Sequence, residues 1–315
     1  MDKAFDVIVI GELNVDIIMN HINGYPEIGK EKISDNMSVT LGSSSAIFAS
    51  NLSSLGAKVA FVGKTGTDSF SEVVMQSLQE RGVDTSHIIR TPDFNTGATI
   101  VLNYGQDRAM ITYPGAMNEL KPADIDYDLI KTGRHLHFSS YFLQPGIGSG
   151  ITSIFKKAKD LGLTTSLDPQ WDPDEKWDLD LKALLPVTDV FLPNIKELQS
   201  LTHKGNLDDA LASVKTFCRN IVIKHGSDGA YLWDGQSLSH QPAFINHDVV
   251  DCIGAGDSFN AGFILKFVQQ QPLAKCMEYG ALTGAISTTA AGGTSAFKSH
   301  KEISGIASLK FNYTF

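Results

Sequence analysis

The chain has 315 residues, 42% of them hydrophobic, and a formal net charge of −9 at pH 7. This length supports one large α/β domain, which we take to be residues 1–315. The acidic balance and the lack of a basic cluster argue against nucleic acid as a partner. No apolar run approaches the roughly 20 residues that cross a bilayer, so we expect no membrane contact. Three cysteines without metal-ligand spacing indicate a reducing compartment, and we expect a cytoplasmic protein.

Short apolar runs alternate with helical patterns along most of the chain. This alternation predicts parallel strands joined by crossover helices, with the carboxyl ends of the strands and their loops on one ligand-binding edge. The expected strands are Val7–Ile10, Val59–Val62, Leu136–Phe138, Thr164–Leu167, Val190–Leu192 and Ile221–Ile223. The expected helices are Ala46–Leu55, Phe70–Arg81, Ile151–Leu161, Leu207–Phe217 and Phe259–Val268.

Two segments break this rhythm, at about residues 17–40 and 96–114. The second is typical of a hairpin, with strands Ala98–Leu102 and Ala109–Tyr113 joined by the polar turn Gly105-Gln106-Asp107. We interpret the two segments as a small antiparallel sheet that covers the strand ends as a lid. Arg108 at the lid turn is typical of a solvated surface residue, although from a lid it can reach a substrate.

The most informative motif is Asp251-Cys252-Ile253-Gly254-Ala255-Gly256-Asp257. We expect it to follow a strand end at Val249-Val250 and to open a helix. Free backbone N–H groups at such a helix start form an anion site, and an aspartate beside it can accept a proton from a hydroxyl group. Together they suit phosphoryl transfer to an alcohol. A plain turn of the same composition is the alternative.

Two further motifs follow early strands. Asn14 and Asp16 lie two residues apart in an extended segment, so their side chains point the same way and can hold neighbouring hydroxyls of a polyol. An exposed loop is the alternative. Gly42-Ser43-Ser44-Ser45 opens a helix, where glycine permits close approach of a ligand and the serines can act as caps.

The loops after two later strands carry candidate nucleotide contacts. Asn194 and Glu197 share one helix face, a spacing that suits either water-mediated Mg²⁺ binding or a capping box. In Lys224-His225-Gly226-Ser227-Asp228-Gly229, the two glycines allow the backbone to bend around a nucleotide, and ordinary hairpin geometry explains them equally well.

In this order, the motifs resemble those of the ribokinase (PfkB) family of carbohydrate kinases over nearly the whole chain. The resemblance rests on residues 11–16, 42–56, 63–68, 194–197, 224–229 and 251–257, together with Asp168-Pro169. It implies a Rossmann-like, three-layer α/β/α sandwich with a small β-sheet lid, and ATP with Mg²⁺ as the phosphoryl donor.

The resemblance also implies roles for individual residues. Asp257 would be the general base, and the amides of Gly254, Ala255 and Gly256 would form the anion hole. Sugar would be held by Asn14, Asp16, Gly42, Ser43 and Arg108. ATP would lie along Asn194, Lys224, Gly226 and Gly229. Glu197 would organise Mg²⁺ through water, and Asp251 would help to bind an activating K⁺.

Departures from the family pattern gather at the acceptor end. Ser43 stands where the family often has a second glycine, and Ile47 where it commonly has an asparagine that contacts sugar. Gln170 replaces an asparagine frequently found after Asp168-Pro169. Ala296 falls near a serine that some members use for the cation.

We therefore expect an ATP-dependent sugar kinase acting on a hydroxymethyl group, with fructose or ribose as acceptor. Few basic residues occur in the acceptor segments, which argues against a phosphorylated acceptor. A nucleoside kinase is one alternative, since Ile47, Phe48, Tyr104 and Phe142 can suit a base. A sugar or nucleotide sensor without catalysis is another. An apolar lid face would favour a homodimer.

Overall fold

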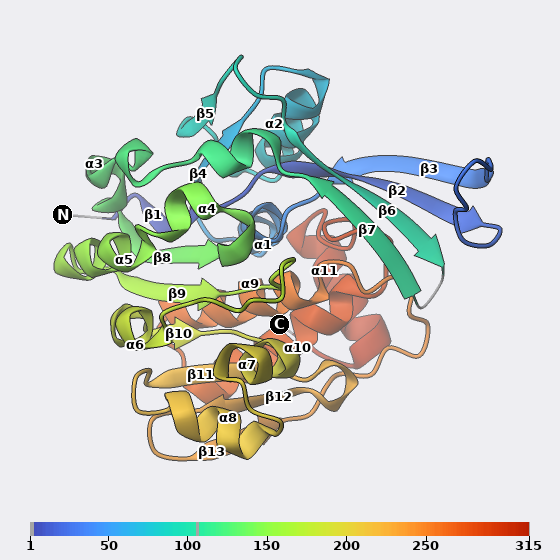
Figure 1. Ribbon diagram of the computed structural model, residues 1–315. Coiled ribbons are helices and arrows are strands. Elements are labelled where there is room, and N and C mark those ends of the chain that lie inside the picture. Colours follow the sequence, from blue (N-terminus) through green and yellow to red (C-terminus); the bar gives the residue numbers. More distant parts are fainter. Residues whose placement is uncertain (1–2, 105–106, 315) are drawn as a thin grey trace.

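The computed structural model describes residues 3–104 and 107–314. Its main sheet has nine strands in the order β13-β12-β11-β10-β9-β8-β1-β4-β5 (Figure 1). Seven of these strands, β11, β10, β9, β8, β1, β4 and β5, run parallel to one another. At one edge, β12 and β13 are added antiparallel. Their bounds are β1 (Phe5–Ile10), β4 (Val59–Thr65), β5 (Ile88–Arg90), β8 (Gly133–Ser139), β9 (Thr164–Asp168), β10 (Val190–Phe191), β11 (Asn220–Lys224), β12 (Ala230–Trp233) and β13 (Leu238–Gln241).

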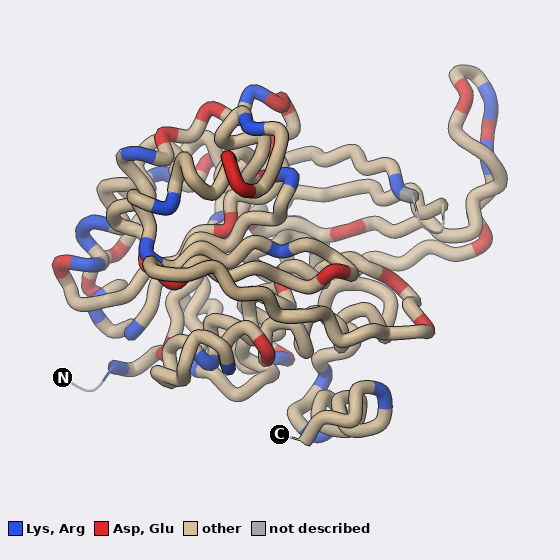
Figure 2. The backbone as a smooth tube through the Cα atoms, turned by 90° about the horizontal axis from the view of Figure 1, so that it is seen from below, with Lys and Arg blue, Asp and Glu red and all other residues tan. Residues whose placement is uncertain are grey.

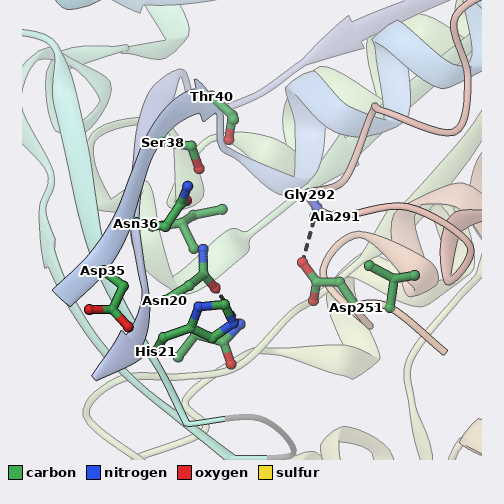
Figure 3. A pocket seen from close by; sticks show the side chains of 12 residues that line it. Asn20, His21, Asp35, Asn36, Ser38, Thr40, Asp251, Ala291 and Gly292 are labelled. Carbon is green, nitrogen blue, oxygen red and sulfur yellow. Dashed lines mark hydrogen bonds between the residues drawn. The ribbon is translucent and has the colours of Figure 1, made fainter. Parts of the chain in front are cut away.

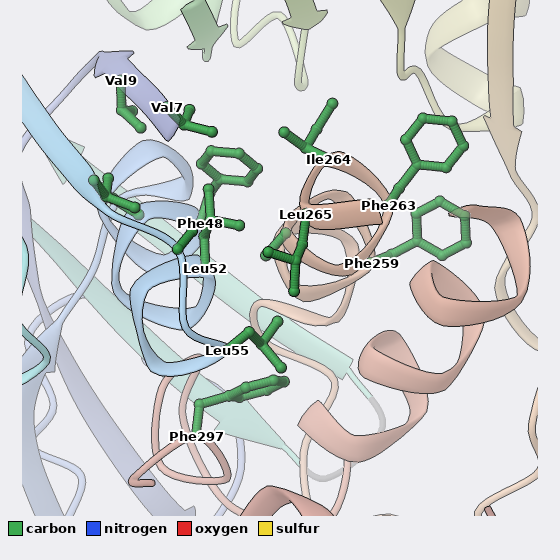
Figure 4. Close-up of a cluster of buried hydrophobic side chains, with 14 of the residues drawn as sticks. Val7, Val9, Phe48, Leu52, Leu55, Phe259, Phe263, Ile264, Leu265 and Phe297 are labelled. Atoms are coloured by element: carbon green, nitrogen blue, oxygen red, sulfur yellow. The ribbon is translucent and has the colours of Figure 1, made fainter. Parts of the chain in front are cut away.

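Helices cover both faces of this sheet, because its central strands are apolar on both sides. Val7 and Val9 of β1 point into one core and Ile8 and Ile10 into the other. The first core packs against α1 (Ser44–Ser54), α2 (Ser69–Glu80), α9 (Ala255–Val268), α10 (Leu273–Ser287) and α11 (His300–Phe311) (Figure 4). The second packs against α3 (Tyr127–Ile130), α4 (Pro145–Gly148), α5 (Ile151–Asp160), α6 (Leu181–Leu184), α7 (Ile195–Thr202) and α8 (Leu207–Val214). The predicted three-layer α/β/α sandwich is therefore confirmed.

A second, four-stranded sheet extends from one side of the body, in the order β3-β2-β6-β7 (Figure 1). Its strands are β2 (Asn14–Ile22), β3 (Ser34–Leu41), β6 (Gly97–Tyr104) and β7 (Asp107–Tyr113). The two segments that break the alternating pattern supply these strands, but the expected all-antiparallel sheet is wrong: β2 pairs with β3 and β6 with β7 antiparallel, whereas β2 and β6, which join the two segments, run parallel. Of the expected turn, Gly105 and Gln106 lie outside the described residues.

The two faces of the small sheet differ in polarity because side chains alternate along each strand. The face that carries Asp16 is largely polar and turns towards the body. The opposite face carries exposed apolar side chains, namely Met37, Val39, Ile100, Ile111 and Tyr113.

One predicted strand is wrong. Val249 and Val250 are exposed and lie in a loop, and β13 ends well before them at Gln241. Two adjacent β-branched residues have strand propensity, but none of the strands in the described residues pairs with them, and the N–H of Val250 donates to the carbonyl of Thr288 instead. The Asp251–Asp257 motif is consequently reached from a loop.

The charged residues of both signs are interspersed over the molecule (Figure 2). None of the helices in the described part of the chain combines the length and apolarity that crossing a membrane would require.

Candidate active site

Helix α9 begins at a left-handed glycine. Gly254 is its N-cap, with φ of 73°, and a Cβ added there would lie 2.6 Å from Cα of Gly293. Only glycine combines this conformation with this close approach. Asn51 of α1 fastens the turn, since its Nδ2 donates to Oγ of Ser258 and to the carbonyl of Gly293, both at 2.9 Å.

The start of α9 offers free backbone donors. Among the described residues, no acceptor is bonded to the N–H groups of Gly256 and Asp257, whereas that of Ala255 reaches the carbonyl of Cys252 at 3.3 Å. The Nζ atom of Lys224 adds positive charge, lying 3.8 Å from where a Cβ of Gly256 would be. Uncompensated amides, the helix dipole and an ammonium group are the features that an anion-binding site requires.

The Asp257 carboxylate lies beside these donors and is 8% exposed. Its Oδ1 accepts hydrogen bonds from the Ser44 hydroxyl and, at 3.2 Å, from Nε2 of Gln170. Burial, followed by the nearby charge of Asp168, raises the pKa of Asp257 to about 7. A carboxylate that titrates near neutral pH is suited to accept a proton from a substrate hydroxyl.

Asp168, at the end of β9, accepts hydrogen bonds from several polar and charged side chains of the site. It is fully buried, and its Oδ2 accepts from Nζ of Lys224 at 2.8 Å, from Nε2 of Gln170 at 2.9 Å and from the Asn260 amide. Burial alone would lower the pKa of Lys224, but the carboxylates of Asp168 and Glu197 outweigh it and raise that pKa. The lysine is therefore held as a cation next to the anion site.

Sequence reasoning missed the roles of Ser44, Asp168 and Gln170. In the sequence, only the family resemblance singles out Asp168 and Gln170, and Ser44 is visible only as part of a helix start. Their contacts join α1, β9 and α9, so no local pattern reveals them. The φ of 59° at Gln170 is a further sign of a constrained site that a sequence does not display.

Glu12, two residues after the end of β1, is a further residue that the sequence did not single out. It is buried and accepts hydrogen bonds from the backbone and hydroxyl of Ser45, from Ser140 and from Gln144. A Cβ on Gly11 would lie 1.9 Å from Oγ of Ser45, so Gly11 is needed for this contact. Glu12 thus fixes the start of α1 against the end of β8.

The predicted polyol contacts come together on β2. Asn14 and Asp16 are buried, share one face, and are joined through Nδ2 and Oδ1 at 3.5 Å. Nδ2 of Asn14 also donates to Oγ1 of Thr99 at 2.8 Å. A Cβ on Gly42 would lie 2.3 Å from Oδ1 of Asp16, so the glycine makes room for that carboxylate. The exposed-loop alternative is wrong for this pair.

Burial raises the pKa of Asp16 to about 6, while the positive charge of Arg108 opposes this shift. Arg108 itself is exposed on β7. Ser43 is the N-cap of α1, where its Oγ donates to the carbonyl of Glu12 and accepts from the N–H of Ala46 at 3.0 Å. Roles of Arg108 and Ser43 in sugar binding stay predictions.

Asn194 and Glu197 form a complete capping box at the start of α7, which is the structural alternative for this motif. The backbone N–H of each residue donates to the side chain of the other, at 2.8 and 2.9 Å. Burial and the charge of Asp168 raise the pKa of Glu197 to about 7. The backbone of Asn194 also forms an isolated parallel β-bridge with Lys224 of β11. This contact brings the start of α7 next to the charged groups around Asp168.

The two glycines after β11 differ. Gly226 is exposed, and a Cβ there would have open space around it. Gly229 has φ of 96°, and a Cβ would lie 2.0 Å from the carbonyl of Gln241 in β13. Gly229 is thus required by strand packing, and a nucleotide contact at either glycine stays a prediction.

Asp251 joins two loops rather than standing free. Its Oδ1 accepts from the N–H of Ile253 and its Oδ2 from that of Gly292, both at 2.9 Å. It also lines a cavity beneath the small sheet (Figure 3). Binding of K⁺ by Asp251 stays a prediction.

The side chains considered for a nucleobase have packing roles. Phe48 is buried and stacks on His137 with ring centroids 3.8 Å apart. Phe142 packs edge-on against Trp177. Ile47 is buried and packs tightly against Gly293, since a Cβ added to Gly293 would lie 2.5 Å from Cδ1 of Ile47. Ile47 therefore supports the turn before α9.

Comparison with known proteins gives a consistent assignment. Residues 4–300 match the pfkB family of carbohydrate kinases. The sequence is 27% identical to 5-dehydro-2-deoxygluconokinase of Geobacillus kaustophilus, over 90% of this chain and 88% of that protein. It is 29% identical to ribokinase of Lactococcus lactis, over 82% of each chain. Arabidopsis thaliana ribokinase complexed with ribose and ATP has a similar fold, with a TM-score of 0.82 at 22% identity, covering 95% of this chain and 97% of that one.

Proposed function

Because the chain belongs to the pfkB family of carbohydrate kinases, and is thus an ATP-dependent carbohydrate kinase, we propose that it phosphorylates a hydroxymethyl group of a neutral sugar. Fructose and ribose are the acceptors we favour. The acceptor oxygen forms a bond to the γ-phosphorus of ATP, the bond from that phosphorus to the β–γ bridging oxygen breaks, and ADP leaves. The hydroxyl proton passes to Asp257.

The observation that carries this proposal is the buried Asp257 carboxylate beside the free N–H groups at the start of α9. A pKa raised to about 7 gives Asp257 useful basicity at neutral pH. The N–H groups of Gly254 and Gly256 stabilise charge on the transferring phosphoryl group, and that of Ala255 can join them by leaving its long bond to Cys252. The ammonium of Lys224 adds to the same field.

At the acceptor end, Asn14 and Asp16 hold neighbouring hydroxyls of the sugar, and Gly42 keeps the Asp16 carboxylate accessible. Ser43 and Arg108 would add contacts from the helix start and from the small sheet. The small sheet, residues 17–40 and 96–114, acts as a lid that excludes water from the reaction.

At the donor end, Asn194 follows β10, Lys224 is the last residue of β11, and Gly226 and Gly229 follow it, at the edge of the sheet where the nucleotide would bind. The donor set fits Mg²⁺ held mainly by phosphates and water, because Oδ1 of Asp168 is buried without a hydrogen-bond partner in the described structure. Asp168 and Glu197 would contact the hydrated ion, which would neutralise phosphate charge. Asp251 would hold K⁺ if the enzyme uses it.

The exposed apolar face of the small sheet supports a homodimer formed through that face. Three free cysteines agree with a reducing, cytoplasmic setting.

The experiment that tests the function is an acceptor screen with ATP and Mg²⁺ that measures ADP release. Neutral sugars, sugar acids, sugar phosphates and nucleosides are compared, with Asp257→Asn as the control. ADP release that depends on a neutral sugar and is lost in the variant supports the proposal. Release with nucleosides alone would indicate a nucleoside kinase. Sugar-induced thermal stabilisation without any turnover would indicate a sensor.

A further inference from the structure

A cavity of about 590 Å³ lies between the small sheet and the loops before α9 and after α10 (Figure 3). Side chains from β2, β3 and β6 form one wall, and the loops form the other. The lining residues are Ile18, Asn20, His21, Asp35, Asn36, Ser38, Thr40, Asn103, Val250, Asp251, Ala291 and Gly292. Its volume falls within the roughly 300–1,000 Å³ typical of small-molecule sites.

The cavity adjoins the acceptor residues but does not include them. Thr40 is paired with Asp16 across β3 and β2, and Ile18 follows Asp16 on the same face of β2. None of Asp16, Gly42 and Asp257 belongs to its lining. A sugar held at Asp16 with its hydroxymethyl group at Asp257 would therefore leave this space for another part of the acceptor.

The chemistry of the lining indicates what that part is. Amide and hydroxyl side chains dominate, and Nδ2 of Asn103 donates to Oδ1 of Asn20 at 2.9 Å, which holds both amides in the wall. Oγ1 of Thr40 is buried without a hydrogen-bond partner in the described structure and lies close to Gly292, 4.0 Å from where a Cβ would be. Such groups pair with hydroxyls.

Charge and shape exclude other classes of substituent. Among the described residues of the lining there is no Lys or Arg, whereas Asp35 and Asp251 are acidic, which disfavours a phosphate or carboxylate group. Arg108, paired with Asn103 across β6 and β7, is exposed and lies outside the lining. The same lining contains no Phe, Tyr or Trp on which a nucleobase could stack.

We propose that this cavity is an acceptor subsite for a second, neutral sugar unit, so that a neutral disaccharide or glycoside that contains the accepted sugar binds more tightly than that sugar alone. This inference rests on the proposed function, because it extends the acceptor held at Asp16. The unit that carries the free hydroxymethyl group binds at Asp16, and its glycosidic partner binds under the small sheet against Asn20, Asn36 and Thr40.

Calorimetric titration tests the inference independently of turnover. Sucrose, maltose, lactose and cellobiose are compared with fructose, glucose and galactose, in the presence of a non-hydrolysable ATP analogue and Mg²⁺. We expect at least one disaccharide to bind about tenfold more tightly than either of its component sugars. ADP release is measured in parallel with ATP.

Two variants locate the binding. Ser38→Phe fills the cavity and should weaken disaccharide binding by about tenfold or more, with less than about threefold change for monosaccharides. Asn36→Ala, at an exposed position, removes an amide without adding bulk to the cavity, and it should also weaken disaccharide binding. Ser239→Phe, on the exposed edge strand β13, makes the same substitution away from the cavity and should alter neither.

The inference is overturned if monosaccharides bind as tightly as every disaccharide, or if Ser38→Phe weakens both classes equally. It is also overturned if a sugar phosphate or sugar acid binds best. Failure of the proposed function looks different, because disaccharides would then bind selectively without ADP release.

Discussion

Gln170 donates its side-chain amide to Oδ1 of Asp257 at 3.2 Å from a backbone held at φ of 59°. The same amide reaches Ser44 and Asp168, so one residue in a disfavoured conformation links the carboxylate of Asp257 to that of Asp168. Non-glycine residues adopt this conformation only where the surroundings enforce it. The orientation of Asp257 therefore depends on β9 as well as on its own helix.

Replacing Gln170 with alanine should lower kcat by roughly tenfold, because the Asp257 carboxylate loses one of the donors that orient it. Steady-state kinetics with the best acceptor measure this, and the KM for ATP should change little. Gln76→Ala is the matched control, since Gln76 is exposed on α2 and, among the described residues, its side chain bonds only to Glu80. Equal kcat values for the two variants would contradict the role of Gln170.

The two glycines at the start of α9 should behave differently when replaced by alanine. Gly254→Ala introduces a Cβ 2.6 Å from Gly293 at a positive φ, and should lower the free energy of unfolding by about 1–3 kcal/mol. Gly256→Ala meets only Nζ of Lys224 at 3.8 Å, and should change stability by less than about 1 kcal/mol. Chemical denaturation distinguishes them, and similar losses in both would contradict the turn geometry.

The rate should depend on the protonation of Asp257. Burial and Asp168 raise its pKa to about 7, and the base is active only when it is deprotonated. Hence kcat/KM should fall about tenfold per pH unit below that pKa and level off above it. A pH profile at fixed ionic strength checks this. A flat profile between pH 5 and 8 would mean that another group takes the proton.

The apolar face of the small sheet should form a homodimer. Ile111 is 69% exposed on this face, and Ile111→Lys places a charge there. Light scattering should give a dimeric mass for the wild-type protein and a monomeric mass for the variant. A monomeric wild-type protein at micromolar concentration would contradict the dimer.

Much of the fold could be predicted from the sequence, because buried parallel strands and amphipathic helices leave periodic local patterns. Val7–Ile10 predicted β1, and Ile151–Leu161 predicted α5, each to within a few residues. Val249-Val250 has strand propensity without a partner strand, and local pattern cannot reveal whether a partner exists.

The site could be predicted where its residues share one motif. Neighbouring positions in the chain bring Asn14 close to Asp16, and likewise Gly254 close to Asp257. Contacts that arise only when distant strand ends meet could not be read locally. Glu12 with Gln144 are 132 residues apart, and Asp168 with Asn260 are 92 apart.

The most direct test of the central claim is the kcat of Asp257→Asn with the acceptor found in the screen. Asparagine keeps the size of the side chain and removes its basicity. We expect kcat to fall by roughly 10²–10⁴-fold while calorimetry shows nucleotide affinity almost unchanged. Full activity in this variant would contradict the assignment of Asp257 as the base that accepts the sugar proton.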